Sequence, residues 1–168
     1  KVVIGKTYTT CGTPDYFAPE LVSSAGHTHA LDWWTLGVLI YELMVGNPPF
    51  ESSTPLMIYQ KVSKGIKNVP FPAQLRGPAE ELIKGLCRSE PSERLPMKKG
   101  GTENIKRARW YEGFDWKAVE NGTMKPPYMP KVLHRKDLCN FSDRAQMPPQ
   151  TFYQDDGSGW DGDFATST

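Results

Sequence analysis

The chain has 168 residues, which is enough for one domain with a core of its own. Its formal net charge of +1 excludes recognition of nucleic acid or of an anionic membrane through a strong overall field, so any charge-based recognition is local. The three cysteines are odd in number and lack the spacing of a metal site, which favours a reducing compartment, and no apolar run is long enough for a membrane span.

The first 30 residues predict a hydroxyl-rich loop and one short helix. Residues 1–12 have no helical period and are rich in threonine. Gly12 and Pro14 restrict the backbone to a tight path, and Pro19 suits the first turn of a helix over residues 20–23. A second loop is expected before the next helix.

Residues 31–45 predict the helix around which the rest of the chain packs. Its apolar residues cover every side, which is typical of a helix that is buried all round. Asp32 lies in the first turn, where a carboxylate suits the unpaired N–H groups, and Gly46 is placed to end the helix. Asp32 and Glu42 are ten residues apart, or about 15 Å along the axis, which is too far for a working acid–base pair. The local sequence alone favours two solitary acids, each with a basic or N–H partner.

Three further helices are predicted, over residues 55–63, 79–88 and 102–110, from apolar periodicity and from start signals such as Thr102. After Trp116 the periodicity ends, and frequent prolines and glycines predict an extended tail without a core of its own. The fold class is therefore expected to be mainly α.

Several motifs in this order resemble the large (C-terminal) lobe of a eukaryotic protein kinase. They are Cys11-Gly-Thr-Pro-Asp-Tyr, Ala18-Pro-Glu, Asp32-Trp-Trp-Thr-Leu-Gly, Pro48-Pro-Phe and Glu93-Arg-Leu. Four later stretches, residues 110–116, 125–127, 140–141 and 158–164, are most similar to the cGMP-dependent kinases of the AGC group. The resemblance implies a kinase large-lobe portion over residues 1–116, from the activation segment onward and without the small lobe. It also implies an AGC-type C-terminal extension over residues 117–168.

The resemblance implies part of a Ser/Thr protein kinase, a transferase that moves the γ-phosphate of ATP, with Mg²⁺, to Ser or Thr in basic sequence contexts. It further implies cGMP as an activator bound outside this stretch, a cytoplasmic location, and two kinds of partner: protein substrates with Arg or Lys upstream of the Ser/Thr, and the small lobe of the same chain. The sequence holds no Gly-rich loop, strand lysine, catalytic-loop Asp and Asn, or DFG aspartate. We therefore expect no catalytic residue and no metal ligand here, and no activity from this stretch alone.

Residues 134–140, His-Arg-Lys-Asp-Leu-Cys-Asn, resemble a kinase catalytic loop only superficially. They follow the Ala-Pro-Glu motif instead of preceding it, Lys136 separates Arg135 from Asp137, and Asn140 comes too early. We do not assign them a catalytic role.

The resemblance assigns substrate recognition to two parts of the chain. Glu42 corresponds to the acid that receives a substrate arginine two residues before the phosphorylated Ser/Thr, and Asp15 would meet an upstream substrate arginine. Thr13 corresponds to a hydroxyl that contacts the catalytic Asp and marks Ser/Thr specificity. The pocket for the substrate residue after the phosphosite would be shaped by Pro14, Phe17 and Thr10.

Thr9 corresponds to the activation-loop phosphorylation site. A phosphate there adds about −1.5 to −2 charges, for which Lys1 and Lys6 are the local partners in the sequence. The alternative is an ordinary loop threonine.

Further correspondences are structural. Glu20 and Arg94 correspond to a buried ion pair, for which the planar guanidinium suits a bidentate contact. Asp32 would hold the backbone of the catalytic loop. The tail residues correspond to one that approaches the adenine, Phe141, and to a hydrophobic motif that docks on the small lobe, Trp160 and Phe164. Aromatic anchors of a tail on any surface are the alternative.

Two alternative functions stay open from the sequence. The chain could be a non-catalytic kinase-lobe binding module, or a fragment of a cyclic-AMP-dependent or other related kinase. An upstream reading frame with the Gly-rich loop and the catalytic motifs would argue against the first. Upstream cyclic-nucleotide domains would separate members of the second group.

Overall fold

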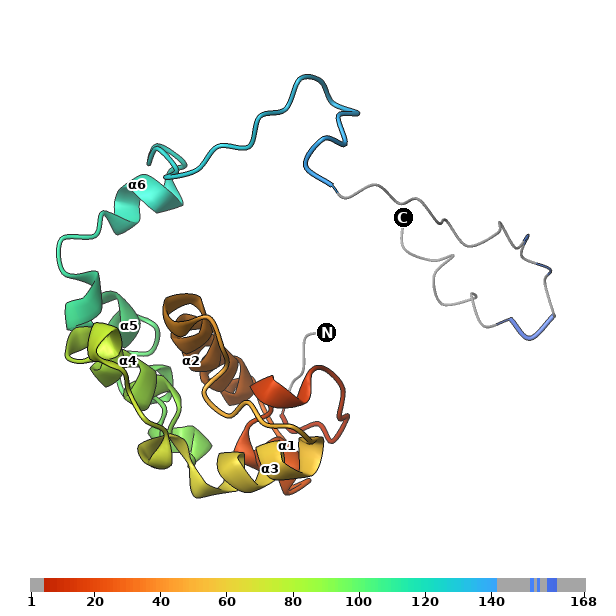
Figure 1. Cartoon of the computed structure of the whole chain (residues 1–168), viewed down its shortest axis with the longest axis vertical. Helices are drawn as coiled ribbons and strands as arrows, with labels where there is room; N and C mark the ends of the chain where they lie inside the picture. Colours follow the sequence, from red (N-terminus) through yellow and green to blue (C-terminus); the bar gives the residue numbers. More distant parts are fainter. Residues whose placement is uncertain (1–4, 142–151, 153, 155–156, 160–168) are drawn as a thin grey trace. The chain divides into compact units, whose positions relative to one another are not determined.

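The computed structural model describes residues 5–141, 152, 154 and 157–159, in two units, Lys1–Met124 and Lys125–Thr168 (Figure 1). Its regular structure within these residues is helical, and the one β contact among them is an antiparallel bridge between Thr7 and His27. The mainly α fold class is confirmed. Within the same residues, no helix has both the length and the apolar character that a bilayer crossing requires.

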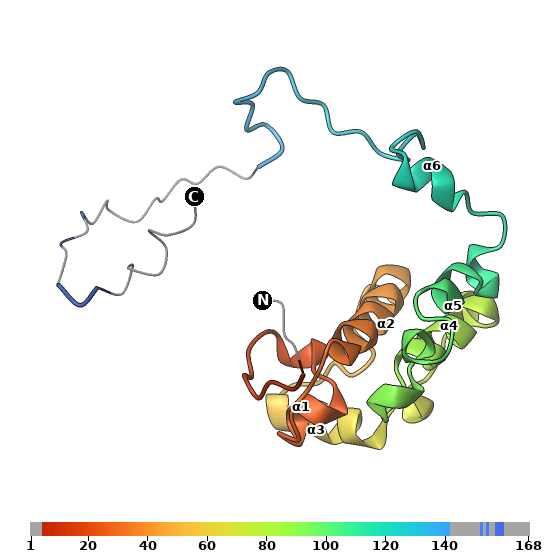
Figure 2. The ribbon, with the colours of Figure 1, turned by 180° about the vertical axis from the view of Figure 1, so that it is seen from behind.

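Helix α2 (Ala30–Val45) forms the centre of the first unit, and helix α4 (Pro78–Leu86) packs alongside it, as Figures 1 and 2 show from opposite sides. The close approach depends on Gly37, where an added Cβ would lie 2.5 Å from the sulfur of Cys87. Gly46 ends α2 in the left-handed region with φ +96°, as predicted, and donates its N–H to the carbonyl of Glu42.

The prediction that α2 is buried all round is wrong for one side of the helix. Trp34 and Val38 are fully buried, whereas Leu39 is 39% and Leu43 is 77% exposed. The described elements that pack on α2 cover only part of its circumference, so an all-round apolar pattern does not lead to all-round burial here.

The remaining helices of the first unit are short. They are α1 (Pro19–Val22), α3 (Pro55–Lys64), α5 (Glu103–Lys106) and α6 (Trp116–Glu120), with 3-10 turns η1 (Pro14–Tyr16), η2 (Ile66–Asn68), η3 (Ala73–Leu75), η4 (Pro91–Glu93), η5 (Leu95–Met97) and η6 (Arg109–Tyr111). Helix α3 begins as expected, because the hydroxyl of Thr54 accepts the N–H of Met57 at 3.4 Å and Pro55 occupies the first turn.

The prediction of one helix over residues 102–110 is wrong. Ala108 is extended, with ψ 140°, and separates α5 from η6. Helix α6 was not predicted, although Asp115 caps it by accepting the N–H of Ala118 at 3.0 Å. The expected boundary between residues 116 and 117 falls inside α6, whereas the compact units divide after Met124. The assignment of the two parts as kinase lobe and tail stays a prediction.

The core of the first unit lies between α2, α3 and α4. Trp34 of α2 stacks on Phe50, with ring centroids 5.5 Å apart, and both side chains are fully buried. Burying side chains of this size contributes about 1.5–3 kcal/mol each, before the entropy of ordering them is counted. This core fixes α2 and thereby the backbone from which Glu42 projects.

In the second unit, the residues that resemble a catalytic loop form a local turn. The carboxylate of Asp137 accepts the N–H groups of Leu133 at 2.7 Å and Cys139 at 2.9 Å. These bonds to the charged form lower the pKa of Asp137 below its ordinary value. The aspartate is thus engaged in turn formation.

Candidate functional site

The candidate site is built on the loop that leads into η1. Thr9, Thr10 and Thr13 are exposed there, and Gly12 takes φ +112°, a left-handed backbone that favours glycine. Thr13 is extended and precedes Pro14, which opens η1. The chain thus makes a tight turn that directs the next side chains toward α2 and α3.

Tyr16 joins this turn to the central helix. Its hydroxyl donates a hydrogen bond to the carboxylate Oε2 of Glu42, which projects from the last turns of α2. This bond, together with burial and the charges of Glu42 and Asp15, raises the pKa of Tyr16 to about 12. The tyrosine therefore stays protonated and keeps donating at any physiological pH.

Glu42 and Asp15 add uncompensated negative charge to this place. Both are partly exposed, and neither forms an ion pair with a cation among the residues that the structure describes. A neutral tyrosine hydroxyl orients Glu42 but leaves its charge in place, and a carboxylate has further acceptor positions. The arrangement is suited to binding a cationic group such as a guanidinium.

Phe17, which follows Tyr16, is largely buried. Its ring stacks on that of Tyr59 from α3, with centroids 5.9 Å apart and planes 3° apart. The ring therefore braces the turn against α3, while Pro14 and Thr10 lie nearer to solvent. A role for these three side chains in a pocket for the substrate residue after the phosphosite stays a prediction.

Glu20 and Arg94 meet in the interior. The two guanidinium nitrogens Nη1 and Nη2 donate to the two carboxylate oxygens at 2.6 and 2.7 Å. Arg94 is 0% and Glu20 is 7% exposed. Nη1 also donates to the carbonyl of Ala30 at 2.8 Å, and Nε donates to that of Arg88 at 3.0 Å. One side chain thus ties α1, the start of α2 and the segment that follows α4 together.

The other predicted site residues do not lie at the site around Tyr16 and Glu42. Asp32 lies in the first turn of α2 and is exposed. Phe141 belongs to the second unit and is 71% exposed. Trp160 and Phe164 lie outside the described residues. No cluster of three or more His, Cys, Asp or Glu suited to a metal ion occurs in the part of the chain that the structure describes.

Tyr16 was missed by the sequence reasoning. The sequence does show a tyrosine next to Asp15 in a turn that begins with proline. Its partner Glu42 is 26 positions away, however, and apolar periodicity does not predict such a contact. The resemblance drew attention to the carboxylate and not to the group that orients it.

Comparison with known proteins identifies the family. Residues 2–110 match the family described as "Protein kinase domain". The chain is 43% identical over 159 residues to the cGMP-dependent protein kinase isozyme 2 forms cD5/T2 of Drosophila melanogaster, covering 95% of this chain and 17% of the relative. It is 42% identical over 163 residues to the cGMP-dependent protein kinase egl-4 of Caenorhabditis elegans, with 95% and 20% covered. It is 40% identical over 160 residues to human cGMP-dependent protein kinase 2, with 95% and 21% covered. The chain therefore spans about a fifth of the length of these relatives.

Proposed function

Because this chain belongs to the protein kinase family, we propose that it is the substrate-recognition part of a Ser/Thr protein kinase resembling the cGMP-dependent kinases. The whole protein transfers the γ-phosphate of ATP to Ser or Thr in substrates with basic residues upstream. This part supplies recognition and activation-loop elements, and the catalytic groups come from the rest of the kinase domain.

The contact between Tyr16 and Glu42 carries this proposal. It holds a carboxylate at the edge of the activation-segment turn, where an extended substrate would pass, and leaves the charge available to a substrate arginine. Asp15 on the same turn strengthens the negative potential. A charge-assisted contact with a guanidinium is commonly worth about 1.5–3 kcal/mol, which is enough to select a basic substrate.

Thr9 is the proposed activation-loop phosphosite. It is exposed, and its side chain makes no hydrogen bond with any residue that the structure describes, so a phosphorylating enzyme can reach it. Lys6 lies on the same loop and donates to the carbonyl of Ala25 at 3.5 Å, a long contact that it can exchange for a phosphate.

The remaining proposals concern groups bound by other parts of the protein. ATP and Mg²⁺ bind to the rest of the kinase domain, cGMP acts as activator at domains outside this stretch, and the protein works in the cytoplasm. Asp32 holds the catalytic-loop backbone, and Phe141, Trp160 and Phe164 anchor the tail near the nucleotide and the small lobe.

The test is phosphate transfer by the full-length protein. It is incubated with Mg-ATP and a serine peptide that carries arginine upstream, with and without cGMP, and a threonine peptide without basic residues serves as control. We expect incorporation into the basic peptide that rises with cGMP. Failure to phosphorylate any Ser/Thr peptide would overturn the proposed activity, and transfer that ignores cGMP would overturn the proposed regulation.

A further inference from the structure

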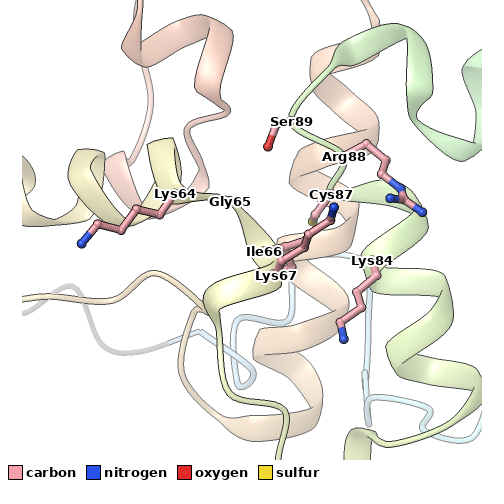
Figure 3. A pocket seen from close by; sticks show the side chains of 8 residues that line it. All are labelled: Lys64, Gly65, Ile66, Lys67, Lys84, Cys87, Arg88 and Ser89. Carbon is pink, nitrogen blue, oxygen red and sulfur yellow. The ribbon is translucent and has the colours of Figure 1, made fainter.

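A hollow of about 310 Å³ lies between the end of α3, the start of η2 and the end of α4 (Figure 3). It shares no lining residue with the site around Glu42. Its volume is at the lower end of the range found for small-molecule sites. Neither the proposed activity nor the substrate contact uses it.

The lining of this hollow is strongly basic. Lys64, Lys67, Lys84 and Arg88 contribute to it, and none of the described residues that line it is acidic. Lys84 is compensated by Glu80, at 2.5 Å, whereas the other three cations pair with no carboxylate in the described part of the chain. Positive charges gathered without counter-charges repel one another, so an anionic ligand gains affinity from all of them.

Lys67 and Arg88 are the cations best placed for a shared ligand. In Figure 3 the side chain of Lys64 points away from those of Lys67, Lys84 and Arg88. Lys64 also lines a neighbouring hollow, together with Lys61 and Asn68. We therefore assign the main contacts to Lys67 and Arg88.

The walls of the hollow are fixed by the fold. Gly65 has φ +78°, and a Cβ there would lie 2.9 Å from the hydroxyl of Ser89, so the two walls approach closely only because this residue is glycine. The carbonyl of Arg88 accepts a hydrogen bond from the buried Arg94 at 3.0 Å. The backbone that carries one of the main cations is thus anchored to the buried ion pair of Arg94 and Glu20.

The remaining lining groups suit an anion as well. The hydroxyl of Ser89 is exposed and has no hydrogen-bond partner among the described residues, so it can donate to a ligand oxygen. Cys87 is fully buried, and burial raises the pKa of its thiol to about 12. The thiol therefore stays neutral and adds no negative charge to the hollow.

We propose that this hollow binds a small ligand carrying two or more phosphate groups on a compact ring, such as an inositol polyphosphate. Lysine and arginine are the side chains that bind phosphate best, and arginine can donate two parallel hydrogen bonds. The hollow is wide enough for a ring, and a ring with several phosphates reaches Lys67, Arg88 and Ser89 at once. A soluble inositol phosphate and a phosphoinositide headgroup both present this chemistry.

The test is calorimetric titration of the full-length protein with inositol trisphosphate. The Lys67→Gln/Arg88→Gln variant removes two charges while keeping two long polar side chains, and Lys99→Gln/Lys117→Gln is the control, because these lysines are exposed, lie outside the hollow and have no ion pair among the described residues. We expect saturable binding that weakens about 10- to 100-fold in the first variant and stays unchanged in the control. Equal melting temperatures would show that both variants fold.

A second arm separates the two sources of the ligand. Phosphatidylcholine vesicles with and without phosphatidylinositol bisphosphate are mixed with the same proteins and sedimented. Binding of inositol trisphosphate alone supports a soluble ligand, and additional sedimentation with the bisphosphate vesicles supports a lipid headgroup, provided that the first variant loses it. Absence of binding in both arms, or binding that the first variant retains, would overturn the proposal.

Discussion

Two junctions in the first unit each hold a glutamate, and they use it in opposite ways. At the inner junction, Glu20 is buried and bound through both oxygens by Arg94. At the outer junction, Glu42 is partly exposed and receives one hydrogen bond from the neutral hydroxyl of Tyr16. A carboxylate whose charge is fully matched inside the protein serves the fold, whereas a carboxylate that is oriented but unmatched can serve a ligand.

Burial explains the difference between the junctions. A charge inside the protein costs several kcal/mol to desolvate unless an opposite charge and hydrogen bonds compensate it, so Glu20 requires Arg94. Glu42 is partly exposed to water and therefore does not require a cation, and none of the described residues provides one. Substitutions at the two junctions should therefore differ in what they change: stability at the inner one and substrate recognition at the outer one.

The largest effect is expected for Arg94→Ala. The change leaves Glu20 buried without its cation, which should lower the free energy of unfolding by about 3–5 kcal/mol. Chemical denaturation measures it. Arg109→Ala is the matched control, because Arg109 forms an exposed ion pair with Glu81 at 3.1 Å and should change stability by about 1 kcal/mol or less. Similar losses in the two variants would mean that the inner junction is not a buried pair.

The second prediction compares an exposed cysteine with a buried one. Cys11 is exposed on the loop that leads into η1, whereas Cys87 is buried next to α2, and burial raises the pKa of Cys87 from 9.0 to about 12. At pH 8, iodoacetamide should therefore label Cys11 much faster than Cys87, because burial shields the Cys87 sulfur and also disfavours its thiolate, which is the nucleophile. Mass spectrometry of the native protein measures the two rates, and denaturation should make them similar. Rapid native labelling of Cys87 would show that the α2–α4 contact opens easily.

The raised pKa of Cys87 also has a consequence for stability. The folded state favours the neutral thiol of Cys87. Its contribution to the free energy of unfolding is therefore fully present below pH 9 and is lost as the pH rises toward 12. Replacing Cys87 by alanine should remove this part of the alkaline loss of stability while lowering stability at pH 7.

A smaller effect is expected for Tyr16→Phe. The change removes the hydroxyl that orients Glu42 and should lower kcat/KM on a basic peptide by about 2- to 10-fold, as expected for one hydrogen bond of about 0.5–1.5 kcal/mol. Tyr59→Phe is the control, since Tyr59 contributes its ring to the stack with Phe17 and its hydroxyl makes no hydrogen bond in the described part of the chain. If both variants lose activity equally, the Tyr16 hydroxyl has no special role.

Local sequence predicted the elements that local residues determine. The central helix was placed within one residue of Ala30–Val45, because Gly46 and the prolines after it stop a helix by themselves. The prediction of one helix over residues 102–110 was wrong because Ala108 adopts an extended backbone, and no glycine or proline in the sequence indicates this break. The exposure of one side of α2 could not be predicted either, because a pattern of apolar residues does not show which neighbouring elements cover them.

Contacts between distant residues were beyond the local pattern. Glu20 and Arg94 are 74 positions apart, and their pairing was suggested by resemblance to a family and not by any period in the sequence. Tyr16 was missed for the same reason, because its contact with Glu42 depends on how η1 packs on α2.

A double-mutant cycle between Glu42 and the substrate tests directly whether this carboxylate recognises the substrate. The full-length protein and its Glu42→Gln variant are assayed on two peptides that differ only in Arg or Ala two residues before the phosphorylated serine, with Glu112→Gln as an exposed control. We predict that Glu42→Gln lowers kcat/KM about 10- to 150-fold on the Arg peptide, much less on the Ala peptide, and that Glu112→Gln changes neither. An equal loss on both peptides would contradict the account, because it would make Glu42 a support of the fold, like Glu20, and not a residue that recognises the substrate.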